Sequence, residues 1–155
     1  MKKILITTLF LLNSIFIFAN PDKVLGKWIT EKAKNGNQII VEIYKTKDNK
    51  FNGKIVKLTM PIYTEGEFKG QEKMDLKNPD EKLQHRKLRG INFVYDFNYS
   101  EKEDKFENGY IYVPPIGKTL YSYMKLQDDG TLLVKGSFDK KGFIGKKQIW
   151  KKYNR

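Results

Sequence analysis

The chain has 155 residues, a length that fits one domain, and it carries 30 lysines and arginines against 18 aspartates and glutamates, a formal net charge of +12. It contains one histidine and no cysteine. This composition excludes disulfides, a thiol nucleophile, and metal sites built from thiolates or several histidines, and we predict that the protein uses neither a metal nor a cofactor.

The first residues have the pattern of a secretory signal peptide. Lys2 and Lys3 give a charged start, and an almost wholly apolar run follows up to the small residue Ala19. This run is shorter than the roughly 20 residues that span a bilayer. We therefore predict a signal peptide over 1–19, cleavage after Ala19, and a periplasmic or secreted domain over 20–155 that does not span the membrane. The alternative is an uncleaved membrane anchor.

Three short apolar runs separated by turn signals follow, a pattern typical of β-strands. In the clearest run Ile39, Val41 and Ile43 share one face. Gly53 lies inside the next run and predicts a bulge that bends the sheet. The three predicted strands cover 26–30, 39–45 and 51–58.

The segment 59–88 is long, charged and poor in strand-forming residues. Within it, Asn78 has the side chain of a helix N-cap, Pro79 suits the first helical position, and Glu81 is placed to complete a capping box. We predict one short helix over 79–86 inside a long loop.

An aspartate in this loop is a candidate anchor. Asp75 can pair with Arg86 or Arg89 and so pin the loop to the rest of the domain. A catalytic role would need a second carboxylate at a controlled distance, which the sequence does not fix. We therefore interpret Asp75, Asn78, Pro79 and Arg86 as structural loop residues.

The strand pattern returns after the loop, interrupted by a charged segment over 100–107 and a hairpin turn at 128–130. The result is about eight or nine consecutive strands. We predict an all-β fold, an up-and-down antiparallel β-barrel, because closure hides the sheet edges. A barrel of this size holds packed side chains or one small ligand. The later predicted strands cover 91–97, 109–113, 119–127, 131–137 and 144–152.

Short motifs follow one another along almost the whole of this domain. They are Gly26-x-Trp28, Gly53-Lys54-Ile55-Val56, Asp75-x-x-Asn78-Pro79, Leu88-x-Gly90, Gly109-Tyr110-Ile111-Tyr112-x-Pro114, Gly117-Lys118-Thr119-x-Tyr121, Leu133-x-Lys135-Gly136 and Gly145-Lys146-x-Gln148-x-Trp150. Their order and spacing resemble the bacterial family called domain of unknown function 2147. The resemblance implies a small exported protein with a lipocalin-like, calycin-type barrel, and it brings no established activity. The chain departs from the family pattern at Val113, where an acid is expected, and at Lys135, where an arginine is expected.

The run 119–127 presents two different faces. Leu120 and Met124 lie on one face, and Tyr121 and Tyr123 on the other. Tyrosine combines a rigid apolar ring with a polar tip, which suits an amphipathic ligand. We predict that the two tyrosines point into the barrel. The alternative is that the aliphatic face points inward and the tyrosines lie on the surface.

We predict a non-enzymatic protein whose barrel binds a small hydrophobic or amphipathic ligand. The chain has no Gly-x-Ser-x-Gly nucleophile motif, and its single histidine, His85, falls at the end of the predicted helix. The predicted binding site consists of Trp28, Tyr112, Tyr121 and Tyr123, with Lys125 at the mouth of the barrel.

The positive charge supports an alternative function. Most of the basic residues are lysines scattered along the strands, and only three are arginine, the side chain suited to bidentate phosphate recognition. We interpret the lysines as a solvated surface and predict no nucleic-acid partner. The alternative is an interaction protein whose basic outer face or long loop binds an envelope polymer, an anionic lipid or a protein partner.

Overall fold

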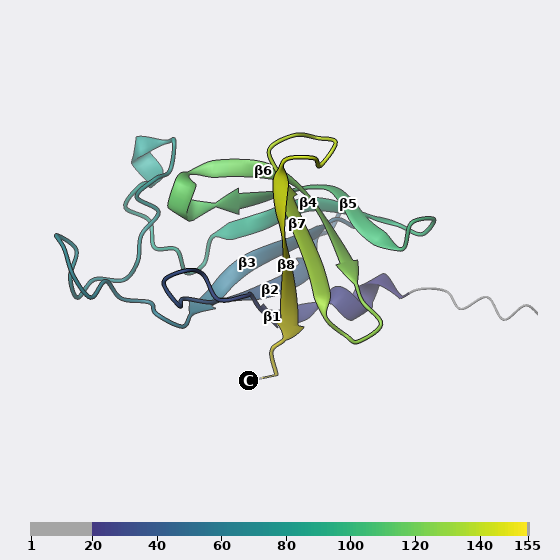
Figure 1. Ribbon diagram of the computed structural model, residues 1–155, viewed down its shortest axis with the longest axis horizontal. Coiled ribbons are helices and arrows are strands. Elements are labelled where there is room, and N and C mark those ends of the chain that lie inside the picture. The colour runs from purple at the N-terminus through teal and green to yellow at the C-terminus, as the bar shows by residue number, and fades with distance from the viewer. Residues whose placement is uncertain (1–19, 155) are drawn as a thin grey trace, which may run out of the picture.

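Eight antiparallel strands close into a barrel in the computed structural model, which describes residues 20–154 (Figure 1). Each strand pairs with the next one in sequence, and the last returns to the first, which confirms the predicted up-and-down topology. The predicted signal peptide, 1–19, lies outside the described residues. The strands are β1 (Gly26–Ile29), β2 (Ile39–Lys45), β3 (Phe51–Leu58), β4 (Asn92–Ser100), β5 (Lys105–Val113), β6 (Lys118–Leu126), β7 (Leu132–Ser137) and β8 (Gly145–Lys152).

The barrel closes through a short seam between β1 and β8. Trp28 is paired with Lys152 in this seam. Where β1 has ended, the carboxylate of Glu31 accepts a hydrogen bond from the backbone N–H of Ile149 at 2.7 Å. A side chain thus continues the pairing and covers part of the edge that β8 would otherwise expose.

Large side chains occupy the interior of the barrel, and a glycine makes room for one of them. Trp28, Trp150, Phe51 and Phe97 are each at most 1% exposed. A Cβ atom at Gly109 would lie 2.3 Å from the ring of Phe97. The ring therefore takes the space that a side chain at this position would need, and the interior is a packed core.

The bulge predicted at Gly53 is confirmed. The pairing of β3 with β4 shifts register on both sides of this residue. A Cβ atom there would lie 3.0 Å from Val41 and 3.2 Å from Val94, so three strands approach one another closely at this point. One consequence is that Phe93 and Val94, consecutive residues of β4, are both buried.

The sequence suggested that the charged segment 100–107 interrupts the strands, but part of it lies in the sheet. Its second half belongs to β5, where Phe106 is 2% exposed and packs in the core. Lys105 and Glu107 flank it as a half-buried ion pair at 3.1 Å. A single apolar residue between two charged ones is the strand alternation that the high charge of the segment obscured.

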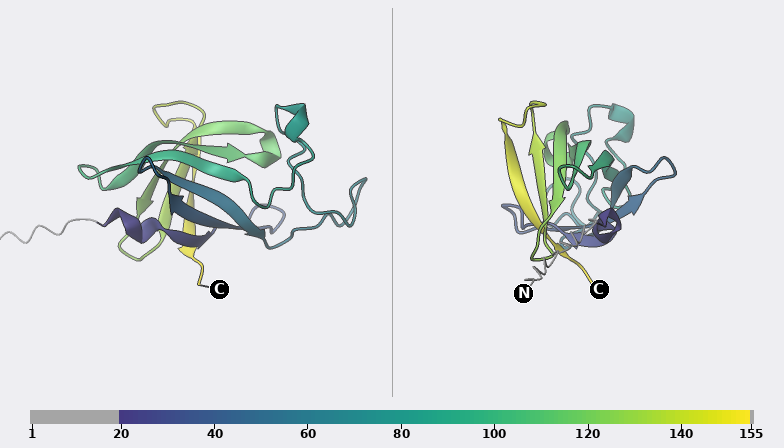
Figure 2. Two further views of the ribbon diagram at one scale, coloured as in Figure 1. Left: turned by 180° about the vertical axis from the view of Figure 1, so that it is seen from behind. Right: turned by 90° about the vertical axis from the view of Figure 1, so that its right-hand side faces the viewer.

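The long loop, 59–91, leaves the barrel between β3 and β4 and stands off one end of it (Figure 2). Its helix is shorter than predicted, a single 3-10 turn, η2 (Glu81–Leu83), in place of 79–86. The N-cap is Asp80, whose carboxylate accepts a hydrogen bond from the N–H of Lys82 at 3.0 Å. The prediction that Asn78 is the N-cap was wrong, because the turn begins two residues later; the Asn78 side-chain oxygen instead accepts a hydrogen bond from the N–H of Asp80 at 2.9 Å, just before the turn.

Two further 3-10 turns, η1 (Pro21–Val24) and η3 (Pro114–Ile116), precede β1 and β6. None of the helical turns within residues 20–154 has the length and apolar character that a membrane crossing requires. In the same part of the chain, the His, Cys, Asp and Glu side chains form no group of three that could hold a metal ion.

Candidate functional site

The orientation of β6 decides which side chains a ligand can reach. Ser122 and Met124 are buried at 8% and 0% exposure, whereas Tyr121 is 41% exposed. The prediction that the tyrosines point into the barrel was therefore wrong. The reason lies on the neighbouring strands, since Ser122 is paired with Gly109 on one side and Gly136 on the other. This row of small residues leaves the interior to large apolar rings.

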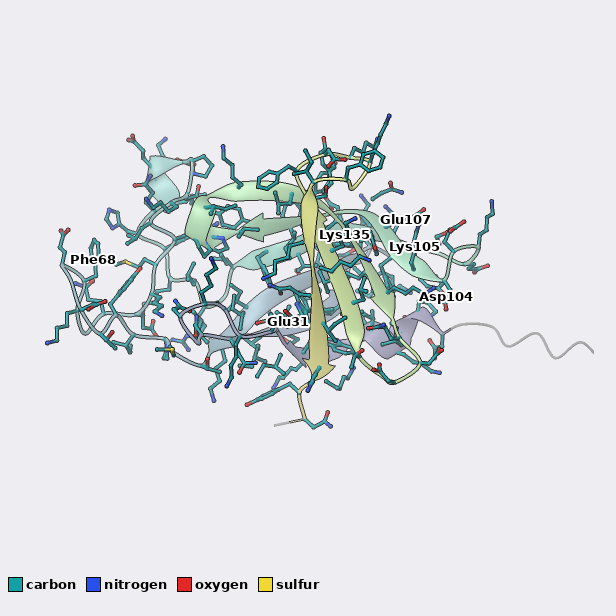
Figure 3. The ribbon with its side chains drawn as sticks, viewed as in Figure 1. Glu31, Phe68, Asp104, Lys105, Glu107 and Lys135 are labelled. Carbon is teal, nitrogen blue, oxygen red and sulfur yellow. The ribbon has the colours of Figure 1, made fainter. Side chains whose placement is uncertain are left out.

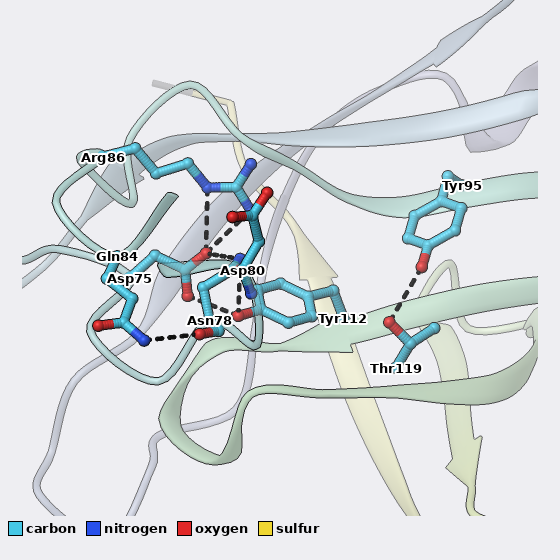
Figure 4. Close-up of polar contacts among 8 residues, drawn as sticks. All are labelled: Asp75, Asn78, Asp80, Gln84, Arg86, Tyr95, Tyr112 and Thr119. Atoms are coloured by element: carbon cyan, nitrogen blue, oxygen red, sulfur yellow. Dashed lines mark hydrogen bonds and ion pairs between the residues drawn. The ribbon is translucent and has the colours of Figure 1, made fainter. Parts of the chain in front are cut away.

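The tyrosines instead form a row on the outer face of the barrel. Tyr95, Tyr110 and Tyr121 are consecutive cross-strand partners on β4, β5 and β6. The ring centroids are 5.7 Å apart in both pairs, with interplanar angles of 25° and 42°. The hydroxyl of Tyr95 is hydrogen-bonded to that of Thr119 at 3.1 Å (Figure 4). Cross-strand aromatic pairs of this kind stiffen a sheet face and fix the ring planes.

A groove of about 350 Å³ begins at one end of this row. Its floor is the outer face of β5, β6 and β7, and the loop between β7 and β8 forms one wall. Figure 3 shows Lys105, Glu107 and Lys135 on this side of the barrel. The lining consists of three tyrosine rings, four lysines, two carboxylates and small polar residues: Lys105, Glu107, Asn108, Gly109, Tyr110, Tyr121, Ser122, Tyr123, Lys135, Ser137, Asp139, Lys140, Lys141 and Gly142.

The groove combines apolar ring surface with positive charge. The ammonium of Lys135 lies 6.0 Å from the ring centroid of Tyr123, within the range of a cation–π contact. Lys105 is paired with Glu107, so these two charges compensate each other. Lys140 and Lys141 on the wall then leave the groove with a positive balance. Such a site suits a ligand that has an apolar body and an anionic group.

The carboxylate of Asp139 contributes one negative charge to the groove, where the four lysines still outnumber the two acids, and protein donors already engage it. It accepts hydrogen bonds from the N–H groups of Ile144 at 2.6 Å and Phe143 at 3.0 Å, and from the Ser137 hydroxyl at 3.0 Å. Donation from Ile144, then from Phe143, lowers the pKa of Asp139 to about 2. The carboxylate therefore stays ionised, and the hydrogen bonds that it accepts hold the loop in its conformation.

A second polar cluster holds the long loop against the barrel (Figure 4). Asp75 is fully buried, and its carboxylate accepts hydrogen bonds from the Tyr112 hydroxyl at 2.6 Å and the Asn78 amide at 2.7 Å. The guanidinium of Arg86 adds two more, from Nε at 3.0 Å and Nη2 at 2.8 Å. The Asn78 amide also donates to the Tyr112 hydroxyl at 3.2 Å.

This cluster is an anchor, because its groups satisfy one another. Four hydrogen bonds engage both oxygens of the fully buried Asp75, three on Oδ2 and one on Oδ1, so protein donors occupy the carboxylate. Burial, followed by the hydrogen bond to the Asp75 carboxylate, raises the pKa of Tyr112 to about 12. Tyr112 therefore remains a neutral donor at physiological pH, which is the form that Asp75 requires.

The structure separates the predicted site residues into four places. Tyr121 and Tyr123 line the outer groove. Tyr112 is part of the loop anchor. Trp28 is buried at the seam, where its Nε1 donates to the carbonyl of Val24 at 2.7 Å, and Lys125 is exposed on β6 away from the groove lining.

The predicted loop residues are only partly brought together. Asp75, Asn78 and Arg86 meet in the anchor, whereas Pro79 is exposed beside it. Sequence reasoning did not single out Lys105 or Asp139 for the groove. Strand alternation alone could not find the pair Lys105 and Tyr110, because residues five apart fall on opposite faces of a regular strand. A register shift between Phe106 and Gly109 brings both to the outer face.

A smaller pocket of about 240 Å³ lies at the foot of the long loop. Glu72 is one of its lining residues, and its carboxylate pairs with Lys87 at 2.6 Å and Arg89 at 3.0 Å. Lys57 and Lys73 also line this pocket, without an acidic partner within 4.0 Å in the described part of the chain. The outer groove is the better candidate for an amphipathic ligand, because it is larger and three tyrosine rings line it, whereas no aromatic ring lines the smaller pocket.

The closed barrel of eight meandering strands, with a packed interior and polar features confined to its outside and its loops, defines a lipocalin-like barrel protein. The chain belongs to the family described as "Uncharacterized protein conserved in bacteria (DUF2147)", whose sequence model matches residues 26–152. This confirms the resemblance drawn from the motifs.

One solved structure is similar to the chain over most of its length. It is described as protein HP1028 from the human pathogen Helicobacter pylori, which belongs to the lipocalin family. The two proteins are 26% identical, the TM-score is 0.70, and the match covers 84% of this chain and 82% of the other. No curated protein matches the chain by sequence.

Proposed function

We propose that this protein is exported and binds a small amphipathic ligand, with an apolar body and an anionic group, in the groove on the outer face of β5, β6 and β7. The observation that carries this proposal is the lining of the groove, where Tyr110, Tyr121 and Tyr123 stand beside Lys135 and the lysines of the neighbouring loop. A lipocalin-like barrel as the scaffold is consistent with a binding role.

The chemistry of the groove divides between its floor and its rim. The tyrosine rings offer rigid apolar surface to a chain or ring of the ligand, and they lose little conformational entropy on binding because their neighbours already hold them. Lys135, Lys140 and Lys141 supply charge-assisted hydrogen bonds to a carboxylate, sulfate or phosphate. Neither part alone selects an amphipathic molecule, whereas the two together do.

The outer groove is preferred over the barrel interior because the interior positions are filled. Trp28, Trp150 and Met124 are between 0% and 1% exposed, so a ligand could enter only by displacing core side chains at a cost of several kcal/mol. The groove requires no such displacement. We propose binding rather than catalysis because the carboxylates of Asp75 and Asp139 are engaged by protein donors.

A fluorescent fatty acid tests the proposal. Residues 20–155 should bind the probe saturably, and Tyr123→Ala should weaken binding about tenfold, which corresponds to roughly 1.4 kcal/mol. Tyr44→Ala is the matched control: Tyr44 is also an outer-face tyrosine with a lysine over its ring, Lys54 at 5.9 Å, but it lies outside the groove. Equal affinity in the two variants, or the absence of saturable binding, would contradict the proposal.

Export has its own test. If residues 1–19 are a signal peptide, the protein recovered from the cell envelope or medium begins at Asn20, and intact-mass spectrometry shows the loss of those residues. Recovered protein that retains Met1 would refute this part of the proposal without affecting the groove.

A further inference from the structure

The loop between β7 and β8 presents three large apolar side chains to solvent. Phe143 is 83% exposed, Ile144 66% and Phe138 59%, and within residues 20–154 these are the only large apolar side chains more than half exposed. Isolated exposed apolar residues are ordinary, but three of them in one loop of seven residues form a patch. Figure 1 shows that this loop stands clear of the barrel between the ends of β7 and β8.

The loop holds these side chains outward through its own hydrogen bonds. The Asp139 carboxylate accepts from the N–H groups of Phe143 and Ile144, and the N–H of Phe138 donates to the carbonyl of Ile144 at 2.9 Å. The N–H of Gly142 donates to the carbonyl of Asp139 at 3.0 Å, with Gly142 at a φ of +82°. The apolar tip is therefore preorganised, and presenting it to a partner requires no further ordering of the backbone.

Lysines surround this tip. Lys140 and Lys141 lie in the loop, and Lys146 and Lys147 begin β8; all four are exposed. Within the described part of the chain, none of the four has an acidic partner within 4.0 Å. The loop has one acid, Asp139, and the four lysines outnumber it, so the local charge facing a partner is positive.

We propose that this loop docks the protein on the surface of an anionic lipid bilayer. Phe138, Phe143 and Ile144 enter the boundary between headgroups and acyl chains, and the four lysines meet the anionic headgroups. An apolar patch bordered by lysines is the pattern that peripheral membrane segments use, and each lysine near an anionic surface adds to the attraction. A protruding tip suits a bilayer, which needs no shape complementarity, better than it suits a protein surface, which would have to supply a matching hollow.

Docking in this way does not depend on what the groove binds. The loop nevertheless has two sides: 139–142 form the wall of the groove, while Phe143 and Ile144 point to solvent. A protein docked by this loop would hold the groove next to the lipid, where amphipathic molecules reside.

Vesicle binding tests the docking surface. Residues 20–155 are used, because they contain the whole closed barrel and because the apolar segment 1–19 would itself bind lipid. The protein should sediment with phosphatidylglycerol–phosphatidylcholine vesicles, and it should bind at least tenfold more weakly to pure phosphatidylcholine vesicles. Raising the salt concentration should weaken binding to the anionic vesicles, since the lysine contribution is screened.

Variants locate the contact. Phe143→Ser combined with Ile144→Ser should weaken binding to anionic vesicles at least tenfold. Ile116→Ser is the matched control, because Ile116 is 48% exposed in η3 and should not contribute. Phe143→Trp adds a reporter whose emission shifts to the blue on docking, against the constant background of Trp28 and Trp150, which are at most 1% exposed.

The outcomes are separable from those of the groove. Tyr123→Ala should weaken binding of the fatty-acid probe and leave vesicle binding unchanged. The probe result tests the groove, and the vesicle result tests the loop. The docking proposal is overturned if the protein does not bind anionic vesicles, if the double variant binds them as well as the wild type, or if the loop captures a protein partner while vesicles remain unbound.

Discussion

The long loop, 59–91, and the β7–β8 loop, 138–144, are both organised by one aspartate, but they use it in opposite ways (Figure 2). Asp75 is fully buried, and its partner Tyr112 lies 37 positions away in sequence. Asp139 is only partly buried and binds its immediate neighbours. The first loop is thus tied to the barrel by tertiary contacts, and the second is tied only to itself.

The two loops also differ in where their large apolar side chains lie. The anchored loop exposes only separate apolar side chains, Met60, Ile62 and Leu83, each between 36% and 41% exposed, and its buried ionic cluster contributes to stability. The self-contained loop keeps no large apolar side chain buried and presents Phe138, Phe143 and Ile144 outward, as the proposed lipid contact requires. Variants in the first loop should unfold the protein, whereas variants in the second should leave the fold intact.

The largest expected effect on stability is the difference between removing Asp75 and removing Asp139. Asp75→Ala leaves the Tyr112 hydroxyl, the Asn78 amide and the Arg86 guanidinium without their acceptor, and it should lower the free energy of unfolding by about 3 kcal/mol. Asp139→Ala removes hydrogen bonds that water can replace and should cost about 1 kcal/mol or less. Urea denaturation monitored by tryptophan fluorescence measures both. Equal losses in the two variants would remove the distinction between the loops.

High pH should weaken the anchored loop. The pKa of Tyr112 is raised from 10.0 to about 12 in the folded protein, so the folded state keeps a proton that the unfolded chain loses between these values. The free energy of unfolding should therefore fall as the pH rises through this window, by up to roughly 3 kcal/mol from this residue. Below pH 10 the stabilisation is fully present.

Tyr112→Phe separates this contribution from others. Tyr99, whose pKa is also raised to about 12 by burial and by Asp104, contributes a similar fall that the variant retains. The variant should lose about 1 kcal/mol at neutral pH and show a shallower decline above pH 10 than the wild type. A decline of unchanged steepness would mean that Tyr112 does not supply the effect.

A pair of glycines tests the docking of the long loop on the barrel. Gly117 has a φ of +61°, and a Cβ atom there would lie 1.8 Å from the carbonyl oxygen of Lys77 in the long loop. Gly130 has a φ of +79° but nothing within 4 Å of the same position. Both alanine variants carry the strain of a left-handed residue. Gly117→Ala should cost about 2 kcal/mol more than Gly130→Ala in thermal denaturation, because it also separates the two segments.

Much of the barrel could be predicted because strand alternation and turn signals are local. The spans 39–45 and 51–58 agree with the predicted strands, and the bulge at Gly53 follows from a glycine inside a strand pattern. These features depend on residues that are adjacent in sequence, so the sequence displays them directly.

The features that were predicted wrongly or missed depend on contacts between residues far apart in the sequence. Tyr121 and Tyr123 point outward because Gly109 and Gly136, on two other strands, shape the interior beside Ser122. The role of the Asn78 amide in the anchor depends on Tyr112, 34 positions away, and the short helical turn begins only after it, at Asp80. The groove likewise exists only once three strands and the β7–β8 loop have been brought together. No periodicity in one segment carries this information.

The smallest expected effect on stability is also the most informative about the β7–β8 loop. Phe143 buries little of its ring, being 83% exposed, so Phe143→Ser should change the free energy of unfolding by less than about 0.5 kcal/mol. Its backbone N–H still donates to Asp139, which keeps the loop in place. A phenylalanine whose ring contributes little to folding, in a loop that its backbone hydrogen bonds keep in place, is what the proposed lipid contact requires. If Phe143→Ser instead destabilised the protein as much as Asp75→Ala, the ring would be part of the core in solution, and the loop would not be free to meet a lipid surface.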